Sequence, residues 1–451
     1  MTTPNLMPPS DGAVGGGLYR AFWRWHFYAG LLVMPVLMLM ALTGGLYLFR
    51  ADIDDVIYRP LMFVEARAEQ ASPDAWAAVA LKAVPGRLVE ADIPADADRS
   101  ARLVVETAGG RRSVYVDPHE ARVLGDIPDG GVMATVKTVH GLSLAGPIPN
   151  LLVEVVAGWA IVMVATGVVL WWPRGQKGGV VTVRSTPSKR LFWRDLHAVT
   201  GLFAGAVIVF LAATGMPWSA VWGAQARKIV AENGWGRPSA PTSGPAGEED
   251  HSAHGGPPAR PWSLQETNLP AAAAAALPLA AVMKHVEDLG LPRPYAVSIP
   301  GEPGKAWSAS HMPDRVEDTR TLYLDAATGQ ALADIRYGQF GPGAKAIEWG
   351  IAVHQGQQFG PINKLVMAAG CVAVWLLGLS ALTMWWKRRP KGRLGAPAAP
   401  EDKRVYAWLA AVVIPLAVVY PLVGASLIVV LGTDLALRAA NRRLRPQGAV
   451  R

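Results

Sequence analysis

Five stretches of the chain contain no Asp, Glu, Lys or Arg and are long enough to cross a lipid bilayer. A membrane-spanning helix needs about 20 predominantly apolar residues. The five runs cover residues 27–49, 155–172, 196–226, 365–386 and 405–433. The first run ends without a small-residue cleavage site and is too long for a signal-peptide core, so it is predicted to be an uncleaved first span.

The fifth run is open to two interpretations. Pro415, Pro421 and Gly424 interrupt it, and a tail rich in arginine follows. A single tilted helix would place that tail on the outside of the membrane. A hairpin of two short spans, 404–419 and 421–437, would return it to the cytoplasm. The positive charge of the tail favours the hairpin, and six spans are expected.

Basic residues gather in the two short segments between spans. Segment 173–195 holds six Lys and Arg against one acid, and segment 387–404 holds seven against two. Because Lys and Arg concentrate in cytoplasmic loops, both segments and the N-terminus are predicted to be cytoplasmic. The long segments 50–139 and 227–353 contain more acids than bases and are expected outside.

The chain contains an internal duplication. His26-x3-Gly30 and Thr43-Gly44 recur 171 residues later as His197-x3-Gly201 and Thr214-Gly215. Several motifs recur at an offset of 214, namely Val139-His140, Gly146-Pro147-Ile148 and Trp171-Trp172 as Val353-His354, Gly360-Pro361-Ile362 and Trp385-Trp386. Each copy consists of a predicted span, an outer segment and a second predicted span. Both copies are expected to start on the same side of the membrane. Such parallel repeats are related by a pseudo-twofold axis along the membrane normal.

Each outer segment shows the pattern of a small α+β unit. Helices are predicted at 75–84 and 277–289. Alternating apolar residues predict three strands in each copy, at 88–93, 101–107 and 113–116 and at 295–299, 306–310 and 321–324. The stretch 236–262 is rich in proline, glycine and alanine and is therefore predicted to be a loop.

These patterns divide the chain into eleven parts. They are a cytoplasmic tail (1–19), the first span (20–50), an outer module (51–139), the second span (140–174), a basic loop (175–195), the third span (196–222), an outer module with a low-complexity insertion (223–353), the fourth span (354–388), a cytoplasmic loop (389–403), a C-terminal helical hairpin (404–438) and a basic tail (439–451). The expected fold is a membrane α-helical bundle of duplicated two-span units with two small α+β modules.

Four histidines occupy repeated positions. His26 and His197 lie near the cytoplasmic ends of the first and third spans, and His140 and His354 just before the outer ends of the second and fourth. Equivalent histidines can face each other across the pseudo-twofold axis. Two facing imidazoles within a helical bundle can ligate a haem iron, so the pairs predict an inner and an outer haem. The alternative is that both copies inherited these histidines without a metal.

Other polar features have more ordinary interpretations. The paired tryptophans indicate an interfacial aromatic belt. Glu154 is either a functional intramembrane acid or an acid that reaches water. Arg24 and Arg194 could meet haem propionates or simply anchor the cytoplasmic ends of helices. The tract 248–254 resembles a metal-binding sequence, but its polar composition is more typical of a solvated loop. His119, His285 and His311 are predicted to lie at the surface.

Composition narrows the possible functions. Hydrophobic residues make up 51% of the 451 residues and charged residues 17%, and the net charge is +8. Because the basic residues concentrate in short loops, the charge indicates membrane topology and no nucleic-acid partner is expected. The single cysteine, Cys371, excludes an internal disulfide, a cysteine-ligated iron–sulfur cluster and a C-x-x-C-H haem attachment. Any haem would therefore be of the non-covalent b type.

The combination of His26-x3-Gly30, Thr43-Gly44, His140, Gly146-Pro147-Ile148 and Trp171-Trp172-Pro173-Arg174, followed by its repeat, resembles the PepSY-associated transmembrane family. The resemblance extends over about residues 18–390. It implies a bacterial inner-membrane protein with periplasmic PepSY-like modules. It also implies reduction of ferric siderophores that depends on two b haems, whose ligands would be His26, His197, His140 and His354.

The expected function is therefore that of a haem-dependent oxidoreductase that carries electrons across the membrane. The acceptor would be siderophore-bound Fe(III) or another periplasmic acceptor. No G-x-G-x-x-G nucleotide fingerprint follows a predicted strand, so a separate cytoplasmic reductase or a quinol is needed as electron donor. Two alternatives are a membrane-anchored regulator that binds peptides outside and a transporter with its site at the repeat interface.

Overall fold

The computed structural model describes residues 13–173, 178–237, 277–300, 306–390, 404–429 and 432. These residues form two compact units. The first, called the helical unit, takes its residues from 1–42, 141–225 and 369–451. The second, called the sheet unit, takes its residues from 43–140 and 226–368.

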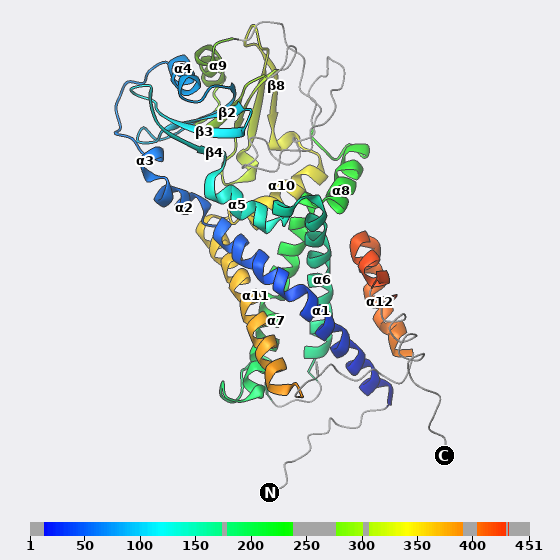
Figure 1. Ribbon diagram of the computed structural model, residues 1–451. Coiled ribbons are helices and arrows are strands. Elements are labelled where there is room, and N and C mark those ends of the chain that lie inside the picture. The colour runs from blue at the N-terminus through cyan, green and yellow to red at the C-terminus, as the bar shows by residue number, and fades with distance from the viewer. Residues whose placement is uncertain are drawn as a thin grey trace, which may run out of the picture. The chain divides into compact units, whose positions relative to one another are not determined.

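Four helices within the described ranges are long and apolar enough to cross a membrane. They are α1 (Ala13–Tyr47), α6 (Pro147–Trp171), α7 (Arg190–Gly215) and α11 (Gly360–Arg388), as Figure 1 shows. The start of α6 follows from its sequence. Gly146 adopts a φ of +99°, which favours glycine, and Pro147 then occupies the first helical position, where its missing N–H costs nothing.

The third apolar run, 196–226, is divided near its end. Its candidate membrane span covers Arg190–Trp218, where the sequence predicted a span over 196–222. Helix α7 ends at Gly215, a short 3-10 helix follows at Met216–Trp218, and α8 (Val221–Glu232) is a separate helix. Pro217 lacks the backbone N–H that would continue the α-helical ladder, which explains the break. The division places Trp222 at the start of a new helix.

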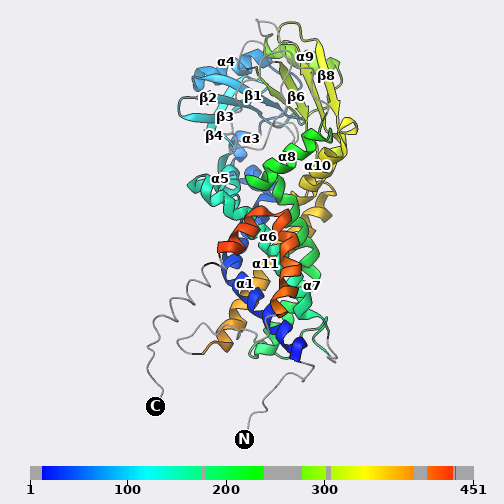
Figure 2. The ribbon, with the colours of Figure 1, turned by 90° about the vertical axis from the view of Figure 1, so that its right-hand side faces the viewer.

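The C-terminal run is broken where the hairpin interpretation placed its turn. Helix α12 (Arg404–Val419) ends before Pro421, and residues 421–429 are again helical. Most of the remaining second arm, to 437, lies outside the described residues. Figure 2 shows α12 in front of α6. The two arms pack on α6 through Val413 and Val423, and Trp159 Nε1 donates to Ser426 Oγ at 2.9 Å.

One antiparallel sheet of eight strands forms the centre of the sheet unit, in the order β4-β3-β2-β1-β5-β6-β7-β8. The strands are β1 (Arg87–Ile93), β2 (Ala101–Thr107), β3 (Gly110–Asp117), β4 (Arg122–Pro128), β5 (Tyr295–Ser298), β6 (Trp307–His311), β7 (Arg320–Leu324) and β8 (Ala331–Arg336). Strands β1 and β5 pair antiparallel, with Ile93 opposite Tyr295. The two outer segments therefore share one sheet, and each contributes a fourth strand that the sequence pattern did not predict.

The apolar face of this sheet is covered by α4 (Pro73–Ala83) and α9 (Leu279–Asp288) (Figures 1 and 2). Trp76 of α4 is 1% exposed and its indole N–H donates to the carbonyl of Pro118 at 3.0 Å. Because neighbouring residues of a strand point to opposite faces, Leu103 enters this core while Arg102 lies on the other face.

Shorter helices complete the sheet unit. They are α2 (Arg50–Ile57), α3 (Arg59–Met62), α5 (Gly131–His140) and α10 (Pro342–His354), with 3-10 helices at Val316–Asp318 and Tyr337–Gln339. A further 3-10 helix, Ser143–Ala145, belongs to the helical unit. Helices α5 and α10 both end at a histidine, His140 and His354, which are the two outer candidates.

Candidate functional site

Two of the repeated histidines meet inside the helical unit. His26 on α1 and His197 on α7 have ring centroids 6.3 Å apart, and the ring planes are inclined by 87°. A metal–imidazole bond is about 2.0–2.1 Å long, so two imidazoles that share one metal through Nε2 have ring centres roughly 6 Å apart. The separation of the two rings therefore matches that of two ligands on one iron.

Each of these rings is held by its Nδ1 atom. His26 Nδ1 lies 2.9 Å from Thr166 Oγ1, whose hydroxyl donates to the carbonyl of Val162 and so accepts from the ring. His197 Nδ1 lies 3.1 Å from both the Leu377 carbonyl and Ser380 Oγ. A proton on Nδ1 leaves Nε2 as the nitrogen with a free lone pair. This is the arrangement that metal-binding histidines usually show.

The two hydroxyl residues that orient these rings were missed in the sequence, although a signal was present. Thr166 and Ser380 are 214 residues apart, the offset of His140 and His354. Thr166 contacts His26 and Ser380 contacts His197, so the two contacts have equivalent positions in the two copies. A search for hydroxyl residues repeated at the offset of 214 residues would have identified both.

Apolar and aromatic side chains surround His26. Trp25, Ala29, Trp159, Val162 and Val413 line a pocket next to its ring. Gly167 also approaches the ring, because a Cβ atom there would lie 3.4 Å from His26 Cε1. The space between these side chains does not admit even a water molecule, so a macrocycle bound at His26 would have to displace some of them.

The outer histidines end equivalent helices of the sheet unit. His140 Nδ1 lies 3.0 Å from Thr43 Oγ1, so the threonine of the recurring Thr-Gly pair contacts the imidazole. A Cβ on Gly44 would lie 3.0 Å from His140 Cε1, so a larger residue at this position would press on the imidazole. His354 is partly buried at the end of α10, and the chain after it is fixed by Asn363, whose amide donates to the Val353 carbonyl at 3.0 Å.

A cavity of about 200 Å³ lies one helical turn from His140 along α5. Its charged lining includes Arg50, Asp54, Arg102 and Lys137. Burial lowers the pKa of Lys137, and the nearby positive charge of Arg50 lowers it further. Burial raises the pKa of Asp54, and one of its carboxylate oxygens is buried without a hydrogen bond.

Glu154 is completely buried, which rules out the interpretation that it reaches water. Its Oε2 accepts the backbone N–H of Trp222 at 2.9 Å, while Oε1 has no hydrogen-bond partner. Trp222 is the second residue of α8, and the first N–H groups of a helix have no partner within it. Glu154 on α6 therefore caps the start of α8.

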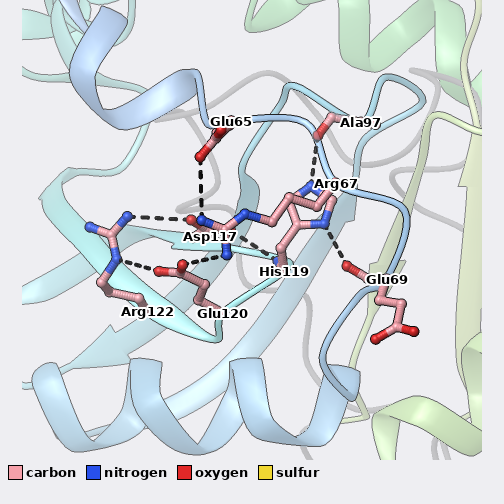
Figure 3. A network of polar contacts seen from close by, with 8 residues as sticks. All are labelled: Glu65, Arg67, Glu69, Ala97, Asp117, His119, Glu120 and Arg122. Atoms are coloured by element: carbon pink, nitrogen blue, oxygen red, sulfur yellow. Dashed lines mark hydrogen bonds and ion pairs between the residues drawn. The ribbon is translucent and has the colours of Figure 1, made fainter.

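The three histidines predicted at the surface are all partly exposed. Figure 3 shows His119 in a polar network of the sheet unit. Its Nδ1 lies 2.7 Å from the Glu69 carbonyl and its Nε2 2.8 Å from the Ala97 carbonyl. Carbonyl oxygens only accept, so both contacts form hydrogen bonds only when the ring is a doubly protonated imidazolium. The two carbonyls accordingly raise the pKa of His119.

The remaining candidates have ordinary structural contacts. Arg194 forms an ion pair with Asp195 at 2.6 Å, and Arg24 lies over the Tyr28 ring at 5.1 Å. The tryptophans of each repeated pair contact each other edge to face. The tract 248–254 lies outside the described residues. Within the described ranges, no group of three or more His, Cys, Asp or Glu is placed to hold a metal ion.

The chain matches the model of a known protein family. The model of the family described as the PepSY-associated TM region matches residues 23–388. No curated protein matches the chain. Because the family model covers most of the sequence, the chain belongs to this family.

Proposed function

We propose that this member of the PepSY-associated TM region family transfers electrons across a bacterial inner membrane through two b haems. His26 and His197 would hold the inner haem, and His140 and His354 the outer one. The observation that carries the proposal is the His26–His197 pair, with ring centroids 6.3 Å apart and with each Nδ1 hydrogen-bonded. A bound haem supplies an iron that gains and loses one electron.

The distribution of charge supports a direction for this transfer. The basic segments 173–195 and 387–404 would face the cytoplasm by the positive-inside tendency. The sheet unit would then face the periplasm. The electron donor would be a cytoplasmic reductase or a quinol, because the chain shows no nucleotide-binding fingerprint of its own.

Siderophore-bound Fe(III) is the proposed acceptor. A haem held by His140 and His354 would supply the single electron that reduces the ferric ion to Fe(II). Hard oxygen ligands hold the less highly charged ion more weakly, so the iron is then released. The protein's own residues orient the imidazoles and exclude water from them, and the Nδ1 hydrogen bonds raise the basicity of the ligands.

The test uses the purified full-length protein. Its visible spectrum is recorded before and after reduction with dithionite, and the reduced protein is mixed anaerobically with a ferric hydroxamate chelate. We expect b-type bands that return to the oxidised form as a ferrous-specific chelator captures Fe(II). The gallium(III) form of the same chelate is the matched control, because it cannot accept an electron.

Two results would overturn parts of the proposal. A folded but colourless preparation from haem-replete cells would exclude haem-mediated transfer and favour a peptide-binding regulator. Reduced haems that stay reduced with the ferric chelate, but are oxidised by oxygen, would exclude this class of acceptor.

A further inference from the structure

The start of α7 and the end of α11 lie at the same end of the helical unit (Figure 1). Lys387 Nζ donates to the carbonyl of Ser188 at 2.9 Å. Arg190 is the first residue of α7 and Arg388 the last of α11, and their positive charges are close enough to repel each other. Two basic segments that are far apart in the sequence therefore form one surface. It is called the basic surface and consists of Arg190, Lys387, Arg388 and Arg389.

The charge of the basic surface is not balanced within the described ranges of the chain. None of its side chains forms an ion pair with a described carboxylate. Two other arginines of segment 173–195 differ, since Arg184 and Arg194 are both paired with Asp195, at 2.7 and 2.6 Å. Asp195 is the single acid of that segment, and both of these arginines already use it. An added anion would therefore be stabilised by several cations at the basic surface.

Aromatic rings hold two of these cations at the end of a candidate membrane span. The Arg388 guanidinium lies 4.7 Å from the centre of the Trp23 ring, and the Arg389 guanidinium lies 3.9 Å from the centre of the Trp386 ring. The Trp386 side chain is 63% exposed. Exposed tryptophans at the ends of membrane spans lie at the level of the lipid headgroups. The cations of the basic surface are therefore expected at the depth of lipid phosphates.

One exposed face of α11 leads from apolar residues to the basic surface. Leu379, Leu382 and Trp386 are spaced by three and four residues, so they share this face, and they are 46%, 56% and 63% exposed. Arg389 follows Trp386 by three residues, and its backbone N–H donates to the Trp385 carbonyl at 2.9 Å, so the helical geometry reaches this cation. This α11 face thus changes from apolar through aromatic to cationic. The same order, from acyl chain to phosphate, is found in a lipid leaflet.

We propose that the basic surface binds the phosphate headgroup of an anionic phospholipid and that the α11 face contacts its acyl chains. Arg190 and Arg388 hold the phosphate, because a guanidinium can donate two parallel hydrogen bonds to phosphate oxygens. Lys387 and Arg389 add further positive charge. A lipid fits both parts of this surface, whereas a soluble acidic protein would leave the α11 face without an occupant. The inference goes beyond the proposed electron transfer and needs no haem.

The test titrates the delipidated full-length protein in detergent with cardiolipin and counts the bound lipid by native mass spectrometry. One cation near the membrane surface strengthens binding of anionic lipid roughly fivefold, so Arg190→Gln combined with Arg388→Gln should weaken cardiolipin binding roughly 25-fold. Lys82→Gln combined with Lys228→Gln removes the same charge from exposed positions of the sheet unit and should leave the affinity unchanged. Arg190→Lys combined with Arg388→Lys keeps the charge and should retain most of the affinity.

Measurements on the wild type alone do not depend on how well the variants fold. The affinity for cardiolipin should fall as the salt concentration rises from about 0.05 to about 0.5 M, because salt screens the attraction between exposed charges. Phosphatidylethanolamine has a zwitterionic headgroup and should bind no better than cardiolipin binds to the Arg190→Gln, Arg388→Gln variant. Inorganic pyrophosphate carries two phosphates but no acyl chains, and it should bind much more weakly than cardiolipin.

Several outcomes would overturn the lipid site. Equal cardiolipin affinity in the wild type and the folded Arg190→Gln, Arg388→Gln variant would remove the role of these cations. Equal affinity of the wild type for cardiolipin and phosphatidylethanolamine, or for cardiolipin and pyrophosphate, would show that headgroup charge or acyl chains contribute nothing. If soluble polyglutamate bound to the wild type and not to this variant, while cardiolipin binding stayed the same, the surface would serve an acidic protein. None of these results depends on bound haem, so the proposed function is tested separately.

Discussion

The imidazole rings of His26 and His197 lie 6.3 Å apart, centroid to centroid, although the residues are separated by 171 positions in the chain. Each ring is oriented by a hydroxyl residue of the following span, Thr166 or Ser380, in its own copy. Hydroxyl residues at matching sequence offsets thus orient both rings of the pair. Chance packing of two histidines would not be expected to reproduce the orienting contact in both copies.

Removal of the hydroxyl that orients His26 should weaken the inner haem selectively. In Thr166→Val the side chain keeps its volume but offers no acceptor to Nδ1. Loss of such an orienting partner typically costs about 10- to 100-fold in metal affinity. We expect roughly tenfold faster loss of the inner haem, measured by transfer to excess apomyoglobin, with the outer haem unaffected.

Thr383→Val provides the matched control for this variant. Thr383 lies on α11, and its hydroxyl donates to the Leu379 carbonyl without contacting a histidine. It should leave both haems in place. Equal haem loss in the two variants would mean that the Thr166 hydroxyl has no specific role.

The His119 contacts should make one part of the sheet unit sensitive to pH. The carbonyls of Ala97 and Glu69 raise the pKa of His119, Asp117 raises it further, and Arg67 opposes them. Because the folded-state pKa is above the unfolded value of about 6.5, the stabilisation is fully present below pH 6.5. It is lost as the pH rises through the folded-state pKa. Hydrogen exchange of amides in segments 64–72 and 94–100, corrected for intrinsic rates, should therefore quicken at higher pH.

The variant His119→Gln should remove this pH dependence. At every pH, the amide exchange rates of this variant should resemble those that the wild type shows only at high pH. His311→Gln changes another partly exposed histidine, whose Nδ1 lies 2.8 Å from the Pro294 carbonyl, and serves as the control. If His119→Gln kept the wild-type pH profile, the imidazolium would not hold these segments.

Arg102 should be essential for the stability of the sheet unit. Its side chain is 17% exposed and pairs with Glu90, Asp92 and Asp129. Arg102→Met would leave three carboxylates close together without their cation, at a cost of about 3–5 kcal/mol in the free energy of unfolding. Denaturant unfolding should show this loss, with partial recovery at acidic pH as the carboxylates take up protons.

Arg111→Met is a suitable comparison for Arg102→Met. The Arg111 side chain is 54% exposed and lies 3.8 Å from Glu106. Exposed ion pairs contribute about 0–1 kcal/mol, so this substitution should have little effect. A similar loss in the free energy of unfolding for both variants would show that the buried ion pairs of Arg102 contribute no more than an exposed ion pair.

Glu154 should act through the cap that it provides for α8. Glu154→Gln keeps an oxygen that can accept the Trp222 N–H, whereas Glu154→Leu leaves this N–H buried without a partner. The expected cost of the leucine variant is about 1–3 kcal/mol, and the glutamine variant should be close to wild type. Thermal unfolding of the detergent-solubilised protein measures both. A glutamine variant as unstable as the leucine variant would indicate that the negative charge itself is needed.

The sequence predicted the elements whose pattern is strong and local. Strand β2 has the predicted bounds 101–107, and the break at 420 falls between the predicted arms. The constant offset between the repeats predicted that His26 and His197 lie close together, and their rings are within contact distance of each other. These features depend on charge-free length, alternation and self-similarity, all of which can be read directly from the chain.

Features that depend on tertiary pairing were not predicted. Strands β4 and β8 at the two edges of the sheet lack clear alternation, and nothing local indicated that β1 would pair with β5. The capping role of Glu154 required α8 to start at Val221, which in turn depended on the break at Pro217. The cavity beside His140 combines residues from three separated segments, so no single motif could reveal it.

The number of haems bound per chain tests the paired-histidine arrangement most directly. Pyridine haemochrome and protein assays on the purified wild type should give two b haems per chain. His26→Ala and His197→Ala should each leave one haem with the same spectrum, and His140→Ala and His354→Ala should each leave the other. A wild-type protein without haem, or single variants that keep both haems, would contradict the assignment.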